Sequence, residues 1–241
     1  MRATFLLAPV AILLLSSCTN DVAKLQAGTL IKEDTPEYSI EVQLPDFSVI
    51  ADEASKEKVT TALRSLMDEE VLLFKSEFVS NAMEHGYVGK NTLDGECSLS
   101  HASVNIASIL CDMMAVAPGA PYPIMYTRVL TYSFPDNKIL NLYELFDGRE
   151  SMMQLSTIIT LDLRAQAQAK GVYDEMKEAW MKEGVRQGFA VGFNTYVLTP
   201  TGASVFFDPN EVGTYAEGRY RVDLPIITIE PILAPGAAAR W

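Results

Sequence analysis

The sequence predicts an α+β fold of two small mixed subdomains, each with antiparallel strands and packed helices. Apolar residues make up 49% of the 241 residues, which is enough to form a packed core and excludes a largely disordered chain. Segments with the two-residue alternation of strands are interspersed with segments that carry one apolar helical face. Short turns join several of the strand segments, which favours hairpins over a doubly wound parallel sheet.

Residues 1–17 have the pattern of a lipoprotein signal peptide. The cationic Arg2 precedes an apolar run over residues 5–15, which is too short to span a bilayer. Leu15-Ser16-Ser17-Cys18 resembles the lipobox of bacterial lipoproteins, in which the peptide is cut before the cysteine and the cysteine is acylated. We therefore expect Cys18 to carry a lipid anchor. The alternative is a plain signal peptide that happens to end near a cysteine.

The residue after Cys18 is Thr19 rather than an aspartate. In a Gram-negative bacterium, the sorting rule of the lipoprotein family then favours the outer membrane, with the protein facing the periplasm. Removal of residues 1–17 deletes Arg2 and changes the formal net charge from −12 to −13. Nucleic-acid binders need a basic surface, so this class of protein is excluded.

The first half of the mature chain begins with a polar tether over residues 18–36, which leads into an N-terminal subdomain over residues 37–117. Tyr38 opens an alternating strand that ends at Pro45. A long amphipathic helix follows over about 52–83. The expected elements after this helix are a loop over residues 86–95 and a hairpin formed by residues 96–103 and 106–116.

The two remaining cysteines, Cys97 and Cys111, lie seven residues on either side of Val104, the centre of the predicted hairpin. Residues at equal distances from the centre lie opposite each other, close enough for a disulfide to span. An oxidising compartment favours the same pairing. Two buried free thiols are the alternative, and a zinc site lacks both the Cys-x-x-Cys spacing and a fourth ligand.

The second half forms a C-terminal subdomain over residues 118–233, which opens at the break Pro118-Gly119-Ala120-Pro121. It is followed by a small-residue tail over 234–241 that we expect to fray. The elements expected here are strands over 126–134 and 139–142, helices over 151–168 and 173–184, and strands over 192–199, 204–208 and 219–229.

Several segments of this half resemble a family of bacterial extracytoplasmic domains first named as domains of unknown function. Residues 141–146 resemble its L-x-x-L-F element, and residues 196–202 with 205–209 resemble its strand-turn-strand core. Residues 211–218 resemble its E-x-x-x-Y-A-x-G loop, and residues 222–226 its closing strand. The N-terminal half looks like the partner domain that precedes this one, so the resemblance covers about 40–233.

Members of this family occur in lysozyme-sensing anti-sigma factors, in non-catalytic regions of peptidoglycan deacetylases and as lipoproteins that stand alone. The resemblance therefore implies an envelope-facing recognition module. The chain departs from the family at the subdomain junction. Where the family carries G-G-A-H-P, this sequence reads Pro118-Gly119-Ala120-Pro121-Tyr122, so a function tied to that histidine is in doubt.

The residues favour no catalytic centre, no metal site and no cofactor. The only histidines are His85 and His101, which lie too far apart to form a metal-binding or triad motif. The acidic runs Asp68-Glu69-Glu70 and Asp174-Glu175 are typical of solvated helix faces. With 31 acidic side chains in the chain, a carboxylate-based glycan-acting enzyme is harder to exclude.

The combined observations predict a non-catalytic periplasmic lipoprotein that acts as a cell-envelope recognition module. Its acidic balance suits a cationic protein such as lysozyme, and peptidoglycan is the other expected ligand. An accessory or structural lipoprotein of an envelope complex is the alternative, and an acid-based enzyme is a third reading. The membrane is contacted through the lipid on Cys18.

Overall fold

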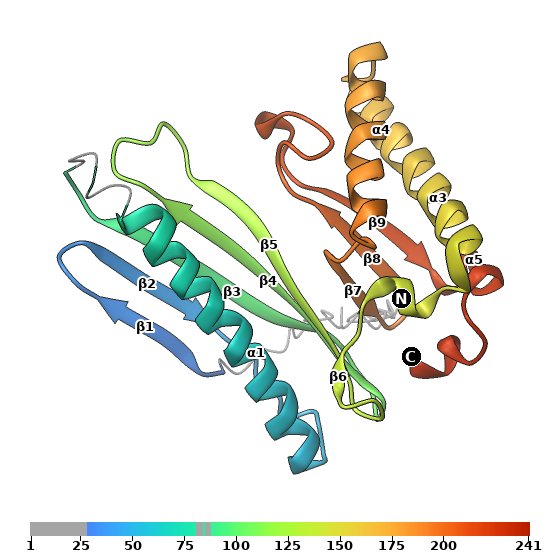
Figure 1. Cartoon of the computed structure of the whole chain (residues 1–241), viewed down its shortest axis with the longest axis horizontal. Coiled ribbons are helices and arrows are strands. Elements are labelled where there is room, and N and C mark those ends of the chain that lie inside the picture. Colours follow the sequence, from blue (N-terminus) through green and yellow to red (C-terminus); the bar gives the residue numbers. More distant parts are fainter. Residues whose placement is uncertain (1–27, 81–83, 85–87) are drawn as a thin grey trace, which may run out of the picture.

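The computed structural model describes residues 28–80, 84 and 88–241, and it shows a mixed α+β fold with two sheets (Figure 1). The first sheet contains β1 (Leu30–Asp34), β2 (Tyr38–Gln43), β3 (Asn91–Ala102), β4 (Ile106–Val116), β5 (Ile124–Ser133) and β6 (Lys138–Ile139). The second sheet contains β7 (Tyr196–Thr199), β8 (Gly202–Phe207) and β9 (Tyr220–Pro225). The helices are α1 (Glu53–Phe74), α3 (Gly148–Ala169), α4 (Glu175–Ala190) and α5 (Ile226–Ile229), and a π-helical turn (Lys75–Val79) continues α1. The predicted α+β class is confirmed.

In the first sheet, the six strands lie side by side in chain order. β2 and β3 pair in parallel, and the other neighbours are antiparallel. Parallel neighbours cannot be joined by a tight turn, and the crossover between β2 and β3 contains α1. The expectation of antiparallel strands alone is therefore wrong at this pair.

Helix α1 lies across one face of the first sheet (Figure 1). Its N-terminus is capped by Asp52, whose carboxylate accepts a hydrogen bond from the Ser55 backbone N–H at 2.8 Å. The buried side of the helix carries Val59, Leu63, Met67, Val71 and Phe74, which form one core with residues of β2, β3, β4 and β5. Because side chains alternate along a strand, the intervening residues of these strands point to the opposite face.

The β3–β4 hairpin has the register that the sequence predicts. Cys97 lies directly opposite Cys111, and the two form a disulfide buried in the core under α1. The predicted bridge is confirmed. β3 begins earlier than expected, because residues from Asn91 onward pair with β2, so the expected loop over 86–95 is wrong from residue 91. A Cβ on Gly95 would lie 2.7 Å from the Met113 sulfur, so glycine lets that side chain pack closely.

The second sheet lies between the first sheet and two helices. All of β8 is buried, and alternate β8 residues Ala203, Val205 and Phe207 belong to a core shared with α3 and α4. Figure 1 shows these two helices side by side on the outer side of the second sheet. At the β7 edge of this sheet, the Leu198 N–H donates to the Ser108 hydroxyl of β4 at 2.8 Å. The fold thus stacks α1, the first sheet, the second sheet and the α3–α4 pair.

The strand pairing corrects three predicted boundaries. Residue 118 was expected to begin the C-terminal subdomain, but β5 pairs along its length with β4 and the first sheet continues to β6. Likewise, the described part of the expected tether, residues 28–36, contains β1, which pairs with β2. The strand expected over 219–229 ends at Pro225, and α5 follows it.

The tail over residues 234–241 is docked, so the expectation that it frays is wrong. Ala237 is buried, and the Trp241 indole N–H donates to the Gly202 carbonyl at 2.7 Å. Arg240 pairs with Asp136 at 2.5 Å, in the turn between β5 and β6. The tail therefore connects the ends of the two sheets.

Candidate functional site

The face of the first sheet opposite α1 presents four exposed carboxylates from three adjacent strands. Glu41 lies on β2, Asp94 and Glu96 on β3, and Asp112 on β4. The pairing places Glu41 beside Asp94, and Glu96 directly opposite Asp112. We call this set of four residues the acidic face.

The four carboxylates are only partly neutralised. Lys32 pairs with Glu41 at 3.0 Å, and Arg219 pairs with Asp112. Among the residues that the structure describes, Asp94 and Glu96 form no ion pair and accept no side-chain hydrogen bond. Within residues 28–80, 84 and 88–241, the acidic face therefore keeps two exposed negative charges without a partner.

The position of Glu96 opposite Asp112 costs stability, because like charges directly across two strands repel each other. These strands are held together by the disulfide and by the core under α1. The exposed pair of Glu96 and Asp112 therefore does not help the protein to fold. It is well suited to binding a cation.

The acidic face borders a shallow hollow of about 410 Å³. Its lining combines the four carboxylates with the side chains of Leu30, Gln43 and Met114. Met114 is exposed and faces the similarly exposed Met125 across β4 and β5. Flexible methionines adapt to varied partners, so the hollow offers apolar contact beside the charges.

The second sheet meets the first sheet beside the acidic face through the Asp208 carboxylate. Asp208 accepts from the Thr127 backbone N–H at 2.8 Å and from the Thr127 hydroxyl at 2.6 Å. β6 pairs only with the last part of β5, at Tyr132 and Ser133. Asp208 therefore supplies the hydrogen-bond acceptor that the Thr127 N–H lacks at this open edge. Arg219, which precedes β9, extends between Asp112 and Asp208.

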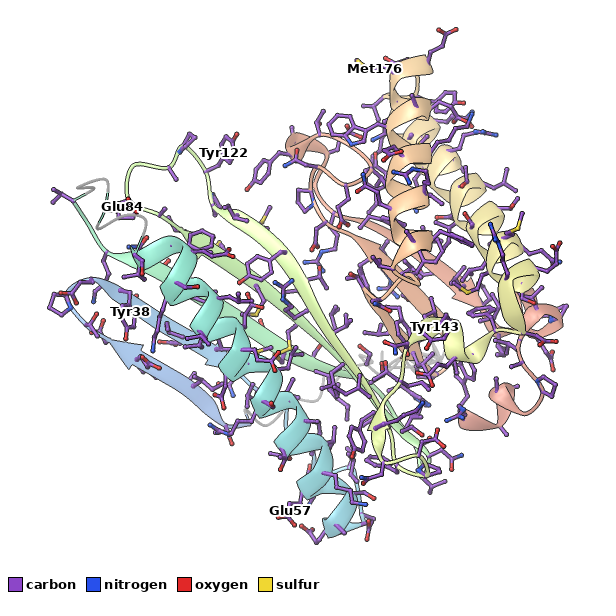
Figure 2. All side chains as sticks on the ribbon, in the orientation of Figure 1. Tyr38, Glu57, Glu84, Tyr122, Tyr143 and Met176 are labelled. Atoms are coloured by element: carbon purple, nitrogen blue, oxygen red, sulfur yellow. A yellow bond between two sulfur atoms is a disulfide. The ribbon has the colours of Figure 1, made fainter. Side chains whose placement is uncertain are left out.

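Further along this junction, Tyr122 lies on the loop between β4 and β5 (Figure 2). Its ring stacks on that of Tyr215, with 4.6 Å between centroids. The Tyr215 hydroxyl also donates to the Pro123 carbonyl at 2.7 Å. These contacts attach the loop that precedes Arg219 to the first sheet.

That loop, residues 211–218, is anchored to α4 by a buried ion pair. The side chains of Lys177 and Glu217 are 5% and 12% exposed, and their charged atoms lie 2.5 Å apart. The same Glu217 oxygen accepts from the Tyr220 hydroxyl at 2.5 Å, and the other accepts from the Thr214 N–H at 2.9 Å. Burial acts to raise the pKa of Glu217, but the bonds from Lys177, Tyr220 and Thr214 outweigh it and hold the pKa at about 2.

A second and more apolar hollow, of about 650 Å³, lies between the start of α3 and the end of α4. Its walls include Phe146, Met152 and Phe189, and Tyr143 on its lining is labelled in Figure 2. Among the described residues, its charged lining consists of Glu144 and Arg149. Within the described part of the chain, this lining brings no cluster of acids, bases or nucleophiles together, so the acidic face is the stronger candidate.

The structure places some of the cysteines and histidines that the sequence analysis named, but not all of them. Cys18 and His85 lie outside the described residues. Cys97 and Cys111 form the disulfide. His101 is partly buried on β3, its Nε2 has no hydrogen-bond partner within the described part of the chain, and burial lowers its pKa.

The acidic run at residues 68–70 is only partly solvated. Asp68 and Glu69 are exposed, but Glu70 is 6% exposed. Glu70 accepts from Arg128 Nε at 2.5 Å and from the Tyr126 hydroxyl at 2.7 Å, which ties α1 to β5. At the other run, Asp174 caps α4 by accepting from the Lys177 N–H at 2.7 Å. The reading of Glu70 as a solvated side chain is therefore wrong.

The described residues offer neither a metal site nor a membrane-spanning helix. No group of three or more His, Cys, Asp or Glu that could hold a metal ion occurs within residues 28–80, 84 and 88–241. None of the helices in those ranges combines the length and apolarity that a membrane span requires.

Sequence reasoning missed all four residues of the acidic face. They come from three strands, and only the register brings them together. One local signal was available: Asp94 and Glu96 alternate with Leu93, Gly95 and Cys97, which is the pattern of a half-buried strand.

Comparison with known proteins agrees with the fold. A family model described as "Protein of unknown function (DUF3298)" matches residues 144–226. No curated protein matches the chain. A DUF3298 family member from Bacteroides fragilis is 14% identical, with a TM-score of 0.59, and the match covers 89% of this chain and 96% of that one.

A DUF3298 family protein from Pseudomonas aeruginosa is 10% identical, with a TM-score of 0.57 and coverage of 88% of this chain and 94% of the other. At these identities the likeness shows the fold alone. The matched segment contains the second sheet, α3 and α4. Residues 144–226 thus match the DUF3298 family model, in a chain that shares its overall fold with DUF3298 family proteins.

Proposed function

We propose that the protein is a non-catalytic, lipid-anchored recognition module of the bacterial envelope, and that its acidic face binds a cationic protein such as lysozyme. The observation that carries this proposal is the exposed like-charge pair of Glu96 and Asp112, with the unpaired Asp94 beside it. Charge complementarity of this kind speeds association and selects cationic partners. The net charge of −12 acts in the same direction.

Family context supports the proposal. The resemblance to domains of lysozyme-sensing anti-sigma factors and of peptidoglycan deacetylases suggests the same class of ligand. Peptidoglycan lacks the dense positive charge that the acidic face selects, so a cationic protein is the better candidate. An accessory role in an envelope complex is the remaining alternative.

Replacement of Asp94 by Asn together with Glu96 by Gln is expected to weaken binding to a c-type lysozyme by about tenfold, because two unpaired exposed charges are removed. Binding of the wild type should also fall steeply with added salt. A pull-down with immobilised lysozyme at low and physiological salt measures both effects.

The matched control is Asp68→Asn with Glu69→Gln, which removes the same charge from the exposed side of α1. This control should bind as the wild type does. Equal weakening of the two double variants would show that net charge alone is responsible. Co-sedimentation with purified peptidoglycan, without lysozyme binding, would favour the other ligand.

The proposed anchor has its own test. Cys18→Ser removes the acylated sulfur, so the variant is expected to stay uncleaved or to leave the membrane fraction. Fractionation of cells and mass spectrometry of the mature N-terminus measure this change. Unchanged partition into the outer membrane would contradict lipidation at Cys18.

A further inference from the structure

Arg219 places a guanidinium against one end of the acidic face. It arises just before β9 in the second sheet, whereas its partner Asp112 lies on β4 of the first. Its Nε lies 3.8 Å from an Asp208 oxygen, and its guanidinium carbon lies 5.7 Å from the centre of the Phe206 ring. The contact with Arg219 thus shows that this end of the acidic face accommodates a guanidinium group.

The contact with Asp112 can be exchanged without loss of the fold. The Asp112 side chain is 54% exposed and that of Arg219 is 27% exposed. Solvent at the carboxylate end weakens such a pair, so the contact with Asp112 contributes little to stability. Asp208 keeps two hydrogen bonds from Thr127 whether or not Arg219 is present. These two bonds join the sheets without the contact between Arg219 and Asp112.

Asp112 is also the carboxylate that a cationic partner needs. It faces Glu96 directly across β3 and β4, so a guanidinium placed between them would contact both. Arg219 already forms an ion pair with one of these two carboxylates, Asp112. A partner's arginine and Arg219 compete for the same carboxylate.

We propose that Arg219 is an internal competitor, which occupies Asp112 until an arginine side chain of the cationic partner replaces it. This inference rests on the proposed function of the acidic face. It assigns Arg219 the role of limiting the affinity of the free face, so that only a partner with several cationic groups displaces it.

Arg219→Gln is expected to bind a cationic partner about threefold to tenfold more tightly than the wild type, because it removes the competing charge. Arg221→Gln is the matched control. Arg221 lies two residues further along the chain, on β9, and near the same Phe206 ring, but the carboxylate with which it pairs is Asp223, at 2.7 Å, rather than one of the acidic face. It should bind as the wild type does.

Two probes separate the inference from the proposed function. The first is a c-type lysozyme, measured by calorimetry, and the second is a hexa-arginine peptide, measured by amide shifts at residues 94–96 and 112. Circular dichroism checks that both variants keep the wild-type melting temperature. Tighter binding of Arg219→Gln to both probes supports the inference and the function together.

The other outcomes are equally decisive. If lysozyme binds none of the three proteins, and the peptide binds Arg219→Gln more tightly than the wild type, the competitor role stands and lysozyme is rejected as the partner. If lysozyme binds the wild type, but Arg219→Gln binds equally or more weakly than Arg221→Gln, the competitor role is wrong and the proposed function stands. If neither probe binds any of the three proteins, both are overturned.

Discussion

Replacement of Glu217 by Gln is expected to lower the free energy of unfolding by about 3–5 kcal/mol, because it leaves the Lys177 ammonium buried without a counter-charge. Lys177 is 5% exposed, and among the residues that the structure describes its ion-pair partner is Glu217 alone. The loop that precedes Arg219 would lose its anchor to α4. Urea unfolding followed by circular dichroism measures the loss.

Two variants control for this effect. Lys177→Met combined with Glu217→Gln removes both charges and should recover much of the lost stability. Glu183→Gln breaks an exposed pair with Arg186 on α4 and should leave stability unchanged. Equal stability of Glu217→Gln and the wild type would contradict a buried ion pair at this position.

The same carboxylate gives a pH dependence with a defined sign. The pKa of Glu217 is about 2 in the folded protein, against an ordinary value of 4.5. A lowered pKa stabilises the folded state above pH 4.5, and this stabilisation is lost as the pH falls from about 4.5 towards 2. The stability difference between wild type and Glu217→Gln should shrink over that interval.

Removal of the disulfide by Cys97→Ala with Cys111→Ala is expected to cost about 2–4 kcal/mol, because the reduced chain gains freedom in the unfolded state. Both sulfurs are buried under α1, so a small packing loss adds to the effect. Thermal unfolding of the oxidised wild type, the reduced wild type and the double variant measures it.

The reduced wild type serves as the control for packing, because it keeps both sulfur atoms. It should fall between the oxidised protein and the double variant. A reduced protein as stable as the oxidised one would show that the bridge constrains nothing beyond what the hairpin and α1 already fix.

The parts of this fold that the sequence predicts are those set by local patterns. The apolar faces of α1 and α3 follow the helical period, and the pairing of Cys97 with Cys111 follows from the centre of one hairpin. The parallel pairing of β2 with β3 could not be read in this way. It joins segments separated by a whole helix, and no local signal specifies the strand order.

The acidic face and the docked tail were missed for related reasons. Each depends on residues far apart in the chain, such as Glu41 with Asp94 and Trp241 with Gly202. The tail is rich in small residues, which is typical of a loose end, but partners in both sheets hold it. The composition of a segment indicates how that segment behaves on its own. It does not identify the distant residues that contact it in the folded chain.

Carboxyl footprinting of the lysozyme complex tests the central claim most directly. A carbodiimide and an amine label exposed carboxylates, and mass spectrometry measures the label at each residue with and without lysozyme. We predict that lysozyme protects Asp94, Glu96 and Asp112 and leaves Asp68 and Glu69 on α1 fully labelled. Equal labelling of all five residues with and without lysozyme, or protection confined to α1, would contradict the acidic face as the recognition surface.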